Sequence, residues 1–163
     1  MKTLSLIILL FITQTSWADE RLLRVEVIVF EQLRNNVTES FNQHATELAD
    51  ASRYAKATAS KKSLYYEYNK LKKSSLFQPL YYKSWQLVVN SGTISLPIKI
   101  ESPALKGWVK LQRGYLLNVI SHLEFDAQDG FIYTLKEKRR VLFDETHYLD
   151  HPKFGAIVKV SSL

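Results

Sequence analysis

The stretch LLRVEVIVFEQ, residues 22–32, is rich in β-branched side chains. Between Val25 and Phe30 every position is apolar except Glu26. A short, almost continuous apolar run of this kind is typical of a strand that is covered on both faces. The stretch therefore predicts a central strand of a sheet, and the other elements must supply its neighbours.

The residues ahead of this strand have the pattern of an export signal. Lys2 gives a short positive start, residues 4–12 are almost wholly apolar, and Ser16 and Ala18 place small side chains before a cleavage point. The apolar run is shorter than the roughly 20 residues that a spanning helix needs. We therefore expect residues 1–18 to be a cleaved signal peptide, with an uncleaved N-terminal anchor as the alternative.

The absence of cysteine and the net charge indicate in which compartment the protein acts and which kinds of partner it binds. The chain contains no cysteine, which excludes disulfides, lipid attachment at a thiol and thiolate chemistry. Its formal net charge is +6, and loss of residues 1–18 removes only Lys2, which leaves about +5. We expect a bacterial exported protein in the periplasm. There the anionic partners are cell-wall peptides, lipid surfaces or acidic proteins and not nucleic acid.

The remaining residues, 19–163, have the length of one domain. Residues 45–75 lack glycine and proline, and Leu64, Tyr68 and Leu71 recur at helical spacing. This predicts one major helix that ends before Pro79. Residues 34–60 are expected to be a flexible loop or the start of that helix.

After residue 79 the pattern changes to strands. Apolar and polar side chains alternate over residues 93–100, where Pro97 indicates an edge strand, and again over residues 105–112, 115–125 and 131–136. Asn90-Ser91-Gly92 predicts a turn, Asp129-Gly130 predicts a hairpin, and residues 156–160 form a last strand. The predicted fold is α+β: a single domain with a mostly antiparallel β-sheet and one major α-helix.

The stretch THYLDHPKFG, residues 146–155, has two histidines at a spacing that resembles a metal site. Pro152 disfavours the helix that would bring His147 and His151 together, and zinc needs at least a third protein ligand. We therefore interpret His147, Asp150, His151, Pro152 and Gly155 as a structural turn motif. A binding role for exposed histidine and tyrosine, and a hydrolase using His147, Asp150 and His151, are the alternatives.

No sequence motif supports catalysis. The chain has no glycine-rich phosphate loop, no G-x-S-x-G and no S-x-x-K. We expect a non-enzymatic protein without a cofactor or a metal.

Cations and tryptophan stand out instead. Lys106, Trp108 and Lys110 share one side of a predicted strand, and a basic run covers residues 136–140. Tryptophan rings stack on sugar rings, and lysine and arginine pair with carboxylates. Burial of the tryptophans in the core and an ordinary solvated strand face are the competing interpretations. The candidate binding residues are Lys106, Trp108, Lys110, Arg113, Arg139 and Arg140.

Three stretches resemble the CsiV family of periplasmic peptidoglycan-binding proteins: RVEVIVFEQ (residues 24–32), LPIKIESPALKGWVKLQRGYLLNV (96–119) and KEKRRVLFDETHYLDHPKFGAIVKV (136–160). The last contains the pattern E-x-H-Y-L-D-H-P-x-x-G, which begins at Glu145 and ends at Gly155. This family often carries a long acidic or proline-rich insertion after the first strand. Here a modest polar stretch and a lysine-rich segment stand in its place.

The resemblance implies a non-enzymatic periplasmic protein that binds peptidoglycan and supports wall synthesis and cell shape. It also implies a link to an outer-membrane lipoprotein activator of a bifunctional penicillin-binding protein. The alternative is a protein–protein adaptor of the wall-synthesis machinery without direct peptidoglycan affinity, which would dock through the helix or an exposed sheet edge.

Overall fold

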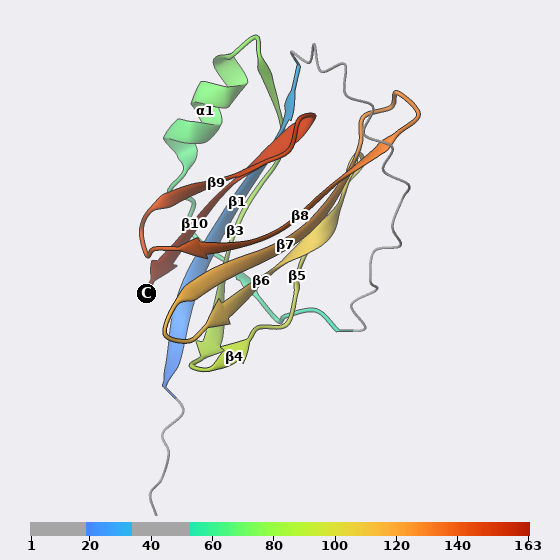
Figure 1. Cartoon of the computed structure of the whole chain (residues 1–163). Coiled ribbons are helices and arrows are strands. Elements are labelled where there is room, and N and C mark those ends of the chain that lie inside the picture. The colour runs from blue at the N-terminus through green and yellow to red at the C-terminus, as the bar shows by residue number, and fades with distance from the viewer. Residues whose placement is uncertain (1–18, 34–52) are drawn as a thin grey trace, which may run out of the picture.

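The computed structural model describes residues 19–33 and 53–163, which form two antiparallel sheets packed face to face (Figure 1). The predicted signal peptide and residues 34–52 of the predicted loop lie outside the described residues. Sheet A has the strand order β2-β3-β1-β10-β9, and sheet B has the order β4-β6-β7-β8, with β5 also paired to β6. The strands are β1 (Glu20–Gln32), β2 (Thr58–Ala59), β3 (Phe77–Asn90), β4 (Thr93–Ile94), β5 (Ile98–Ser102), β6 (Leu105–Arg113), β7 (Leu117–Asp126), β8 (Ile132–Val141), β9 (Thr146–Asp150) and β10 (Phe154–Ser162).

Strand β1 lies at the centre of sheet A, between β3 and β10, as its apolar run predicted. Its side chains alternate between two layers because successive residues of a strand point to opposite faces. Val25, Val27 and Val29 belong to the large core between the two sheets. Ile28 and Phe30 belong to a smaller core that also contains Leu64 and Leu71 of the helical segment. Both faces of β1 are therefore covered.

The one helix is a minor element and not the major one that was predicted: α1 (Tyr65–Lys73) has nine residues. Residues 53–60, expected to be either loop or the start of the helix, are not helical, and Leu64 and Leu71 are buried. The edge of β3 explains why residues 58–60 are extended and not helical. Strand β3 pairs there with β2, and the Ser84 carbonyl oxygen accepts a hydrogen bond from the Ser60 amide. Pairing with a neighbouring strand overrides the local helical preference of this segment.

The strands of sheet B follow the predicted alternation. The turn at residues 90–92 leads into β4, and Gly92 has a φ of 74° that suits glycine. Pro97 lies between β4 and β5, which both pair with the outer edge of β6, so the predicted edge position is confirmed. Strands β7 and β8 form the predicted hairpin around Asp129-Gly130. The antiparallel prediction is confirmed, but the strands build two sheets and not one.

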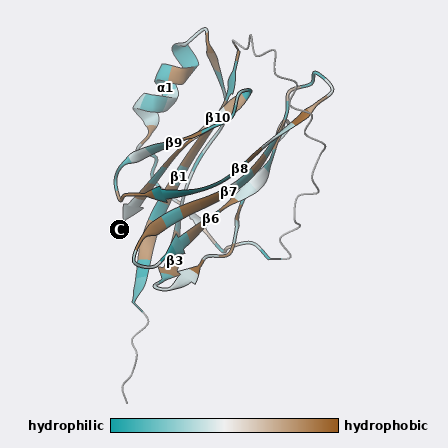
Figure 2. Cartoon of the chain, viewed as in Figure 1, coloured by the Kyte–Doolittle hydropathy of each residue, from teal (hydrophilic) through white to brown (hydrophobic). Residues whose placement is uncertain are grey.

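The layers are thus α1, sheet A and sheet B, in that order. In Figure 1 α1 lies against the sheet that contains β1 and β10 and away from β6, and the two separate cores agree with this placement. In Figure 2 α1 is mostly hydrophilic, and hydrophobic positions concentrate in the strands. The outer face of sheet A is partly covered by α1. No described element packs as a layer on the outer face of sheet B.

Candidate functional site

The outward-facing side chains of sheet B form one surface, which we call the basic face. Directly paired residues of neighbouring strands share a face, so the pairing of Lys99 with Trp108, of Trp108 with His122 and of His122 with Lys136 defines one row across four strands. Three neighbouring rows of paired residues, which pass through Lys106, Lys110 and Gln112, contribute further outward-facing side chains of the sheet. The charged, aromatic and histidine members of the basic face are Lys99, Glu101, Lys106, Trp108, Lys110, His122, Glu124, Asp126, Lys136, Lys138 and Arg140.

The basic face carries an excess of positive charge. Six of its side chains are Lys or Arg and three are Glu or Asp, so the formal charge is +3 with His122 neutral. One glutamate is already paired: Lys99 Nζ lies 2.6 Å from Glu101 Oε2, and this ammonium holds the pKa of Glu101 below its usual value. Lys106, Lys136, Lys138 and Arg140 are exposed and point into solvent. The face is therefore suited to an anionic ligand.

Trp108 lies in the middle of this surface and is half-buried. Lys110 Nζ is 4.4 Å from the centroid of its ring, and the ring of His122 meets it edge-on at 5.7 Å. Trp85, by contrast, lies on the inner side of β3 and packs against the core between the sheets. The two tryptophans thus have different roles, and only Trp108 presents a ring on the basic face.

Beside Trp108, on β7, lie two titratable side chains with little solvent contact, His122 and Glu124. His122 Nε2 is 3.6 Å from Glu124 Oε1. Burial, followed by the nearby Lys136 ammonium, lowers the pKa of His122, and burial raises the pKa of Glu124. Within residues 19–33 and 53–163, neither of these two atoms nor Trp108 Nε1 has a hydrogen-bond partner. Buried polar atoms without partners are uncommon, which makes the centre of the basic face chemically distinct from its rim.

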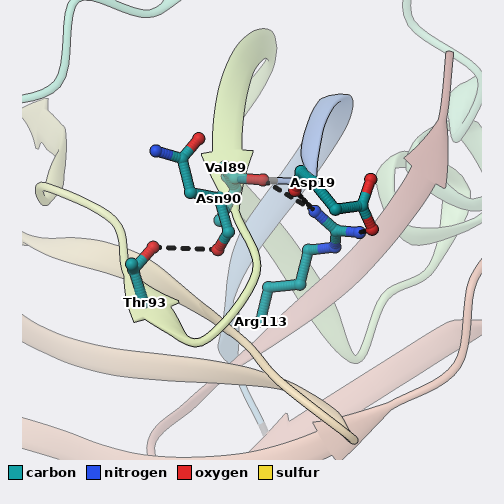
Figure 3. A network of polar contacts seen from close by, with 5 residues as sticks. All are labelled: Asp19, Val89, Asn90, Thr93 and Arg113. Atoms are coloured by element: carbon teal, nitrogen blue, oxygen red, sulfur yellow. Dashed lines mark hydrogen bonds and ion pairs between the residues drawn. The ribbon is translucent and has the colours of Figure 1, made fainter. Parts of the chain in front are cut away.

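Arg113 does not lie on the basic face, although it was predicted as a binding residue. Its side chain is 7% exposed and points inward at the end of β6. The guanidinium donates to the carbonyl oxygens of Asp19 and Val89 and forms an ion pair with the Asp19 carboxylate (Figure 3). These bonds join β6 to β3 and to the residue that precedes β1. Its donors are thus used within the fold.

Arg139 also lies apart from the other candidates. It pairs with Val119, which faces the core, so its side chain is on the side opposite Arg140. Its Nε lies 2.6 Å from Glu137 Oε1. The structure brings together Lys106, Trp108, Lys110 and Arg140 of the predicted set. It adds Lys99, His122, Lys136 and Lys138, which the prediction omitted.

The missing members could have been found from period-two spacing. In β8, Lys136, Lys138 and Arg140 are two residues apart and must share a face, whereas Arg139 shares the parity of Leu135. In β6, Arg113 shares the parity of Leu111 and therefore points inward. Alternation alone thus separates outward from inward cations.

The stretch at residues 146–155 forms a hairpin. His147 and Asp150 lie in β9, which pairs with β10, and the chain turns at residues 151–153. His147 Nε2 accepts the Leu142 amide at 3.0 Å, and His151 Nδ1 accepts the Lys153 amide at 3.2 Å. Each histidine therefore has a backbone partner close in sequence.

Tyr148, Asp150 and Gly155 fix the same hairpin against β1. Tyr148 donates its hydroxyl to Asp150 Oδ1 at 2.7 Å, and burial followed by this bond raises the pKa of Tyr148. Its ring stacks on Phe30 with centroids 5.8 Å apart. A Cβ at Gly155 would lie 2.7 Å from the Tyr148 ring, so any larger residue here would displace the ring. The spacing in the motif thus has a packing reason.

No arrangement for a metal is present in the described residues. Across residues 19–33 and 53–163, no group of three or more histidine, aspartate or glutamate side chains could hold an ion. In the same ranges, no helix has the length and apolar character needed to cross a membrane.

Comparison with known proteins gives one match. The family model described as "Peptidoglycan-binding protein, CsiV" matches residues 109–163, about a third of the chain, and its description names no catalytic activity. These residues include β7 to β10 and, on the basic face, Lys110, Lys136, Lys138 and Arg140. No match to a curated protein or to a solved structure was found. Over residues 109–163 the chain thus matches the CsiV family of peptidoglycan-binding proteins, which confirms the resemblance drawn from its sequence.

Proposed function

We propose that this protein binds peptidoglycan through the basic face of sheet B. The observation that carries the proposal is the gathering of Lys106, Lys110, Lys136, Lys138 and Arg140 around the half-buried ring of Trp108 on one face without a covering layer. Wall peptides end in carboxylates, which pair with these cations, and sugar rings can lie on the indole. The match to the CsiV family supports the same ligand.

The wider role belongs to the proposal as well. A non-enzymatic accessory protein of wall synthesis and cell shape would act in the periplasm, after removal of residues 1–18. There it would contact an outer-membrane lipoprotein activator of a bifunctional penicillin-binding protein. N-terminal sequencing of the protein from the cell envelope tests the export step, because it should begin at Asp19. An intact Met1 in the envelope would contradict it.

A pull-down with purified sacculi tests wall binding. The protein should pellet with sacculi at low salt and be released as the salt concentration rises, because ions screen exposed charges over about 10 Å at 0.1 M. Replacement of Lys106, Lys110, Lys138 and Arg140 by Glu should leave it in the supernatant. Wild-type protein that stays in the supernatant at low salt would show that wall binding is wrong.

Two neighbouring arginines provide a matched control. Arg140→Gln removes a cation from the basic face, whereas Arg139→Gln removes one from the opposite side of the same strand. Binding to sacculi should weaken with the first and stay unchanged with the second. Equal effects would mean that net charge, and not this face, drives retention.

A further inference from the structure

A second surface lies on the far side of the molecule and covers α1 and the adjoining part of β3. Two hollows flank Tyr65: one of about 250 Å³ between α1 and β3 reaches Lys62 and Tyr82, and one of about 410 Å³ on α1 itself reaches Tyr66, Lys70 and Lys73. We call this surface the tyrosine groove and define it by Lys62, Tyr65, Tyr66, Lys70, Lys73 and Tyr82. It lies on the outer side of sheet A and is separated from the basic face by both sheets.

Glu26, the one polar residue in the apolar run of β1, holds the residues beside the tyrosine groove in place by hydrogen bonds. Its carboxyl group is fully buried and accepts the Ser63 amide at 2.6 Å, the Leu64 amide at 3.2 Å and the Tyr82 hydroxyl at 3.2 Å. These bonds hold the chain where it enters α1 and also hold the ring of Tyr82. The groove is therefore preorganised, which lowers the entropy cost of binding.

The exposed chemistry of the groove is aromatic and cationic. Tyr65 and Tyr66 are 64% and 76% exposed, and Lys62 Nζ lies 4.4 Å from the centroid of the Tyr82 ring. Lys70 and Lys73 line the second hollow, and Glu67 is the one acidic residue of α1. Flat rings beside ammonium groups suit a ligand that combines ring faces with negative charge.

Other occupants fit this surface less well. A partner helix needs an apolar groove, but apart from Pro79 and Leu80 of β3 the two hollows are lined by Tyr, Lys and Asn side chains. A lipid surface also needs apolar side chains that enter the acyl region, and tyrosine is the largest apolar group that α1 exposes.

We propose that the tyrosine groove binds a saccharide that carries carboxylate groups. Tyr65 and Tyr66 contact the sugar rings, and Lys62, Lys70 and Lys73 pair with the carboxylates. The proposal does not rest on peptidoglycan binding by the basic face, because the two surfaces share no residue. The protein therefore has two ligand surfaces on opposite sides of the sandwich.

An NMR titration of the full protein tests this proposal, with oligogalacturonate as the acidic saccharide and chitotetraose as the neutral one. Oligogalacturonate should shift the backbone amides of α1 and β3, and chitotetraose should bind at least about tenfold more weakly, since it lacks the charge that the lysines recognise. No shift in α1 and β3, a footprint confined to the basic face, or equal binding of chitotetraose would overturn the proposal.

Variants sharpen the test. The pair Tyr65→Ala and Tyr66→Ala should weaken binding of oligogalacturonate by about tenfold or more. Tyr115→Ala should not, although Tyr115 is fully exposed in the turn after β6. Lys70→Gln with Lys73→Gln should reduce the salt dependence, and Lys56→Gln, an exposed lysine outside the groove, should leave it unchanged.

Two further probes distinguish other ligand classes. Polyglutamate carries carboxylates without sugar rings, and phosphatidylglycerol vesicles present anionic headgroups. Tighter binding of either probe than of oligogalacturonate, lost in the Tyr65→Ala and Tyr66→Ala variant, would assign the groove to a peptide or to a membrane and overturn the saccharide proposal. Because sacculi also present sugar rings and carboxylates, the site of the NMR shifts separates the two proposals: oligogalacturonate shifts in α1 and β3 that are lost in this variant test the groove, whatever the basic face binds.

Discussion

The charged residues on the outer faces of the two sheets differ in burial and in role. On sheet A the charged residue Glu26 is enclosed under the start of α1, and the Ser63, Leu64 and Tyr82 donors complete its bonds. On sheet B most of the cations are exposed, and only the centre of that face, at His122 and Glu124, has little solvent contact. Glu26, covered and with complete hydrogen bonds, holds the fold together, whereas the exposed Lys106, Lys136 and Lys138 can meet an anionic ligand.

The largest difference between the faces should appear when each glutamate is removed. Glu26→Ala should lower the free energy of unfolding by about 3–5 kcal/mol, because buried donors lose their acceptor. Glu124→Ala should cost less than about 1 kcal/mol, because no bonded donor is left behind. Chemical denaturation of both variants measures the contrast, and similar losses would show that the two faces are not distinct.

Two arginines of sheet B allow its inner and outer sides to be compared: Arg113 points inward, and Arg140 lies on the basic face. Arg113→Met should cost about 1–3 kcal/mol, since it leaves the buried Val89 carbonyl without this donor and removes the ion pair with Asp19. Arg140→Met should stay within about 0.5 kcal/mol, since Arg140 is exposed. Thermal unfolding of the two variants checks the difference. A greater loss for Arg140→Met would contradict the assigned faces.

A smaller effect is expected where the β9–β10 hairpin packs on sheet A. Gly155→Ala places a Cβ 2.7 Å from the Tyr148 ring and should cost about 1–2 kcal/mol, because the exposed side of that ring allows it to move. Gly114→Ala, where a Cβ would meet nothing within 4 Å, should be close to neutral. The two unfolding midpoints give the answer; coincident midpoints would remove the packing role of Gly155.

The smallest effect concerns pH. Burial lowers the pKa of His151, and Asp150 opposes this shift only in part. A depressed histidine pKa means that its contribution to stability is complete above the unfolded value of about 6.5 and is lost as the pH falls below it. His151→Asn keeps an acceptor for the Lys153 amide without a titrating ring. The fall in unfolding midpoint between pH 7 and pH 5 should therefore be shallower in this variant, and an unchanged slope would contradict the assignment.

Alternation in the sequence predicted most of the strands, because half-buried strands must repeat every second residue. The continuous apolar run located β1, and the turn residues located the turn at Gly92 and the β7–β8 hairpin. It could not reveal β9, where Leu149 is the one buried side chain and the other four residues are polar or exposed. A strand of that kind is identified by its partner β10 and not by its own pattern.

The length of the helix depended on contacts distant in sequence. Residues 55–60 had helical composition, but the free edge of β3 offered them hydrogen bonds that a single sequence does not show. The candidate site was likewise only partly predictable. The cations were visible, but the row from Lys99 through Trp108 and His122 to Lys136 depends on strand order and register, which come from four strands together.

The pairing of β1 with β10 has a consequence for how the molecule is assembled (Figure 1). Leu23 lies beside Ser162, so the middle of sheet A joins segments that are far apart in the sequence. Contacts between such distant residues slow folding, because a long loop must close before they form. One edge of β1 therefore stays unpaired until residues 154–162 reach it, so sheet A cannot be completed before β10 is in place.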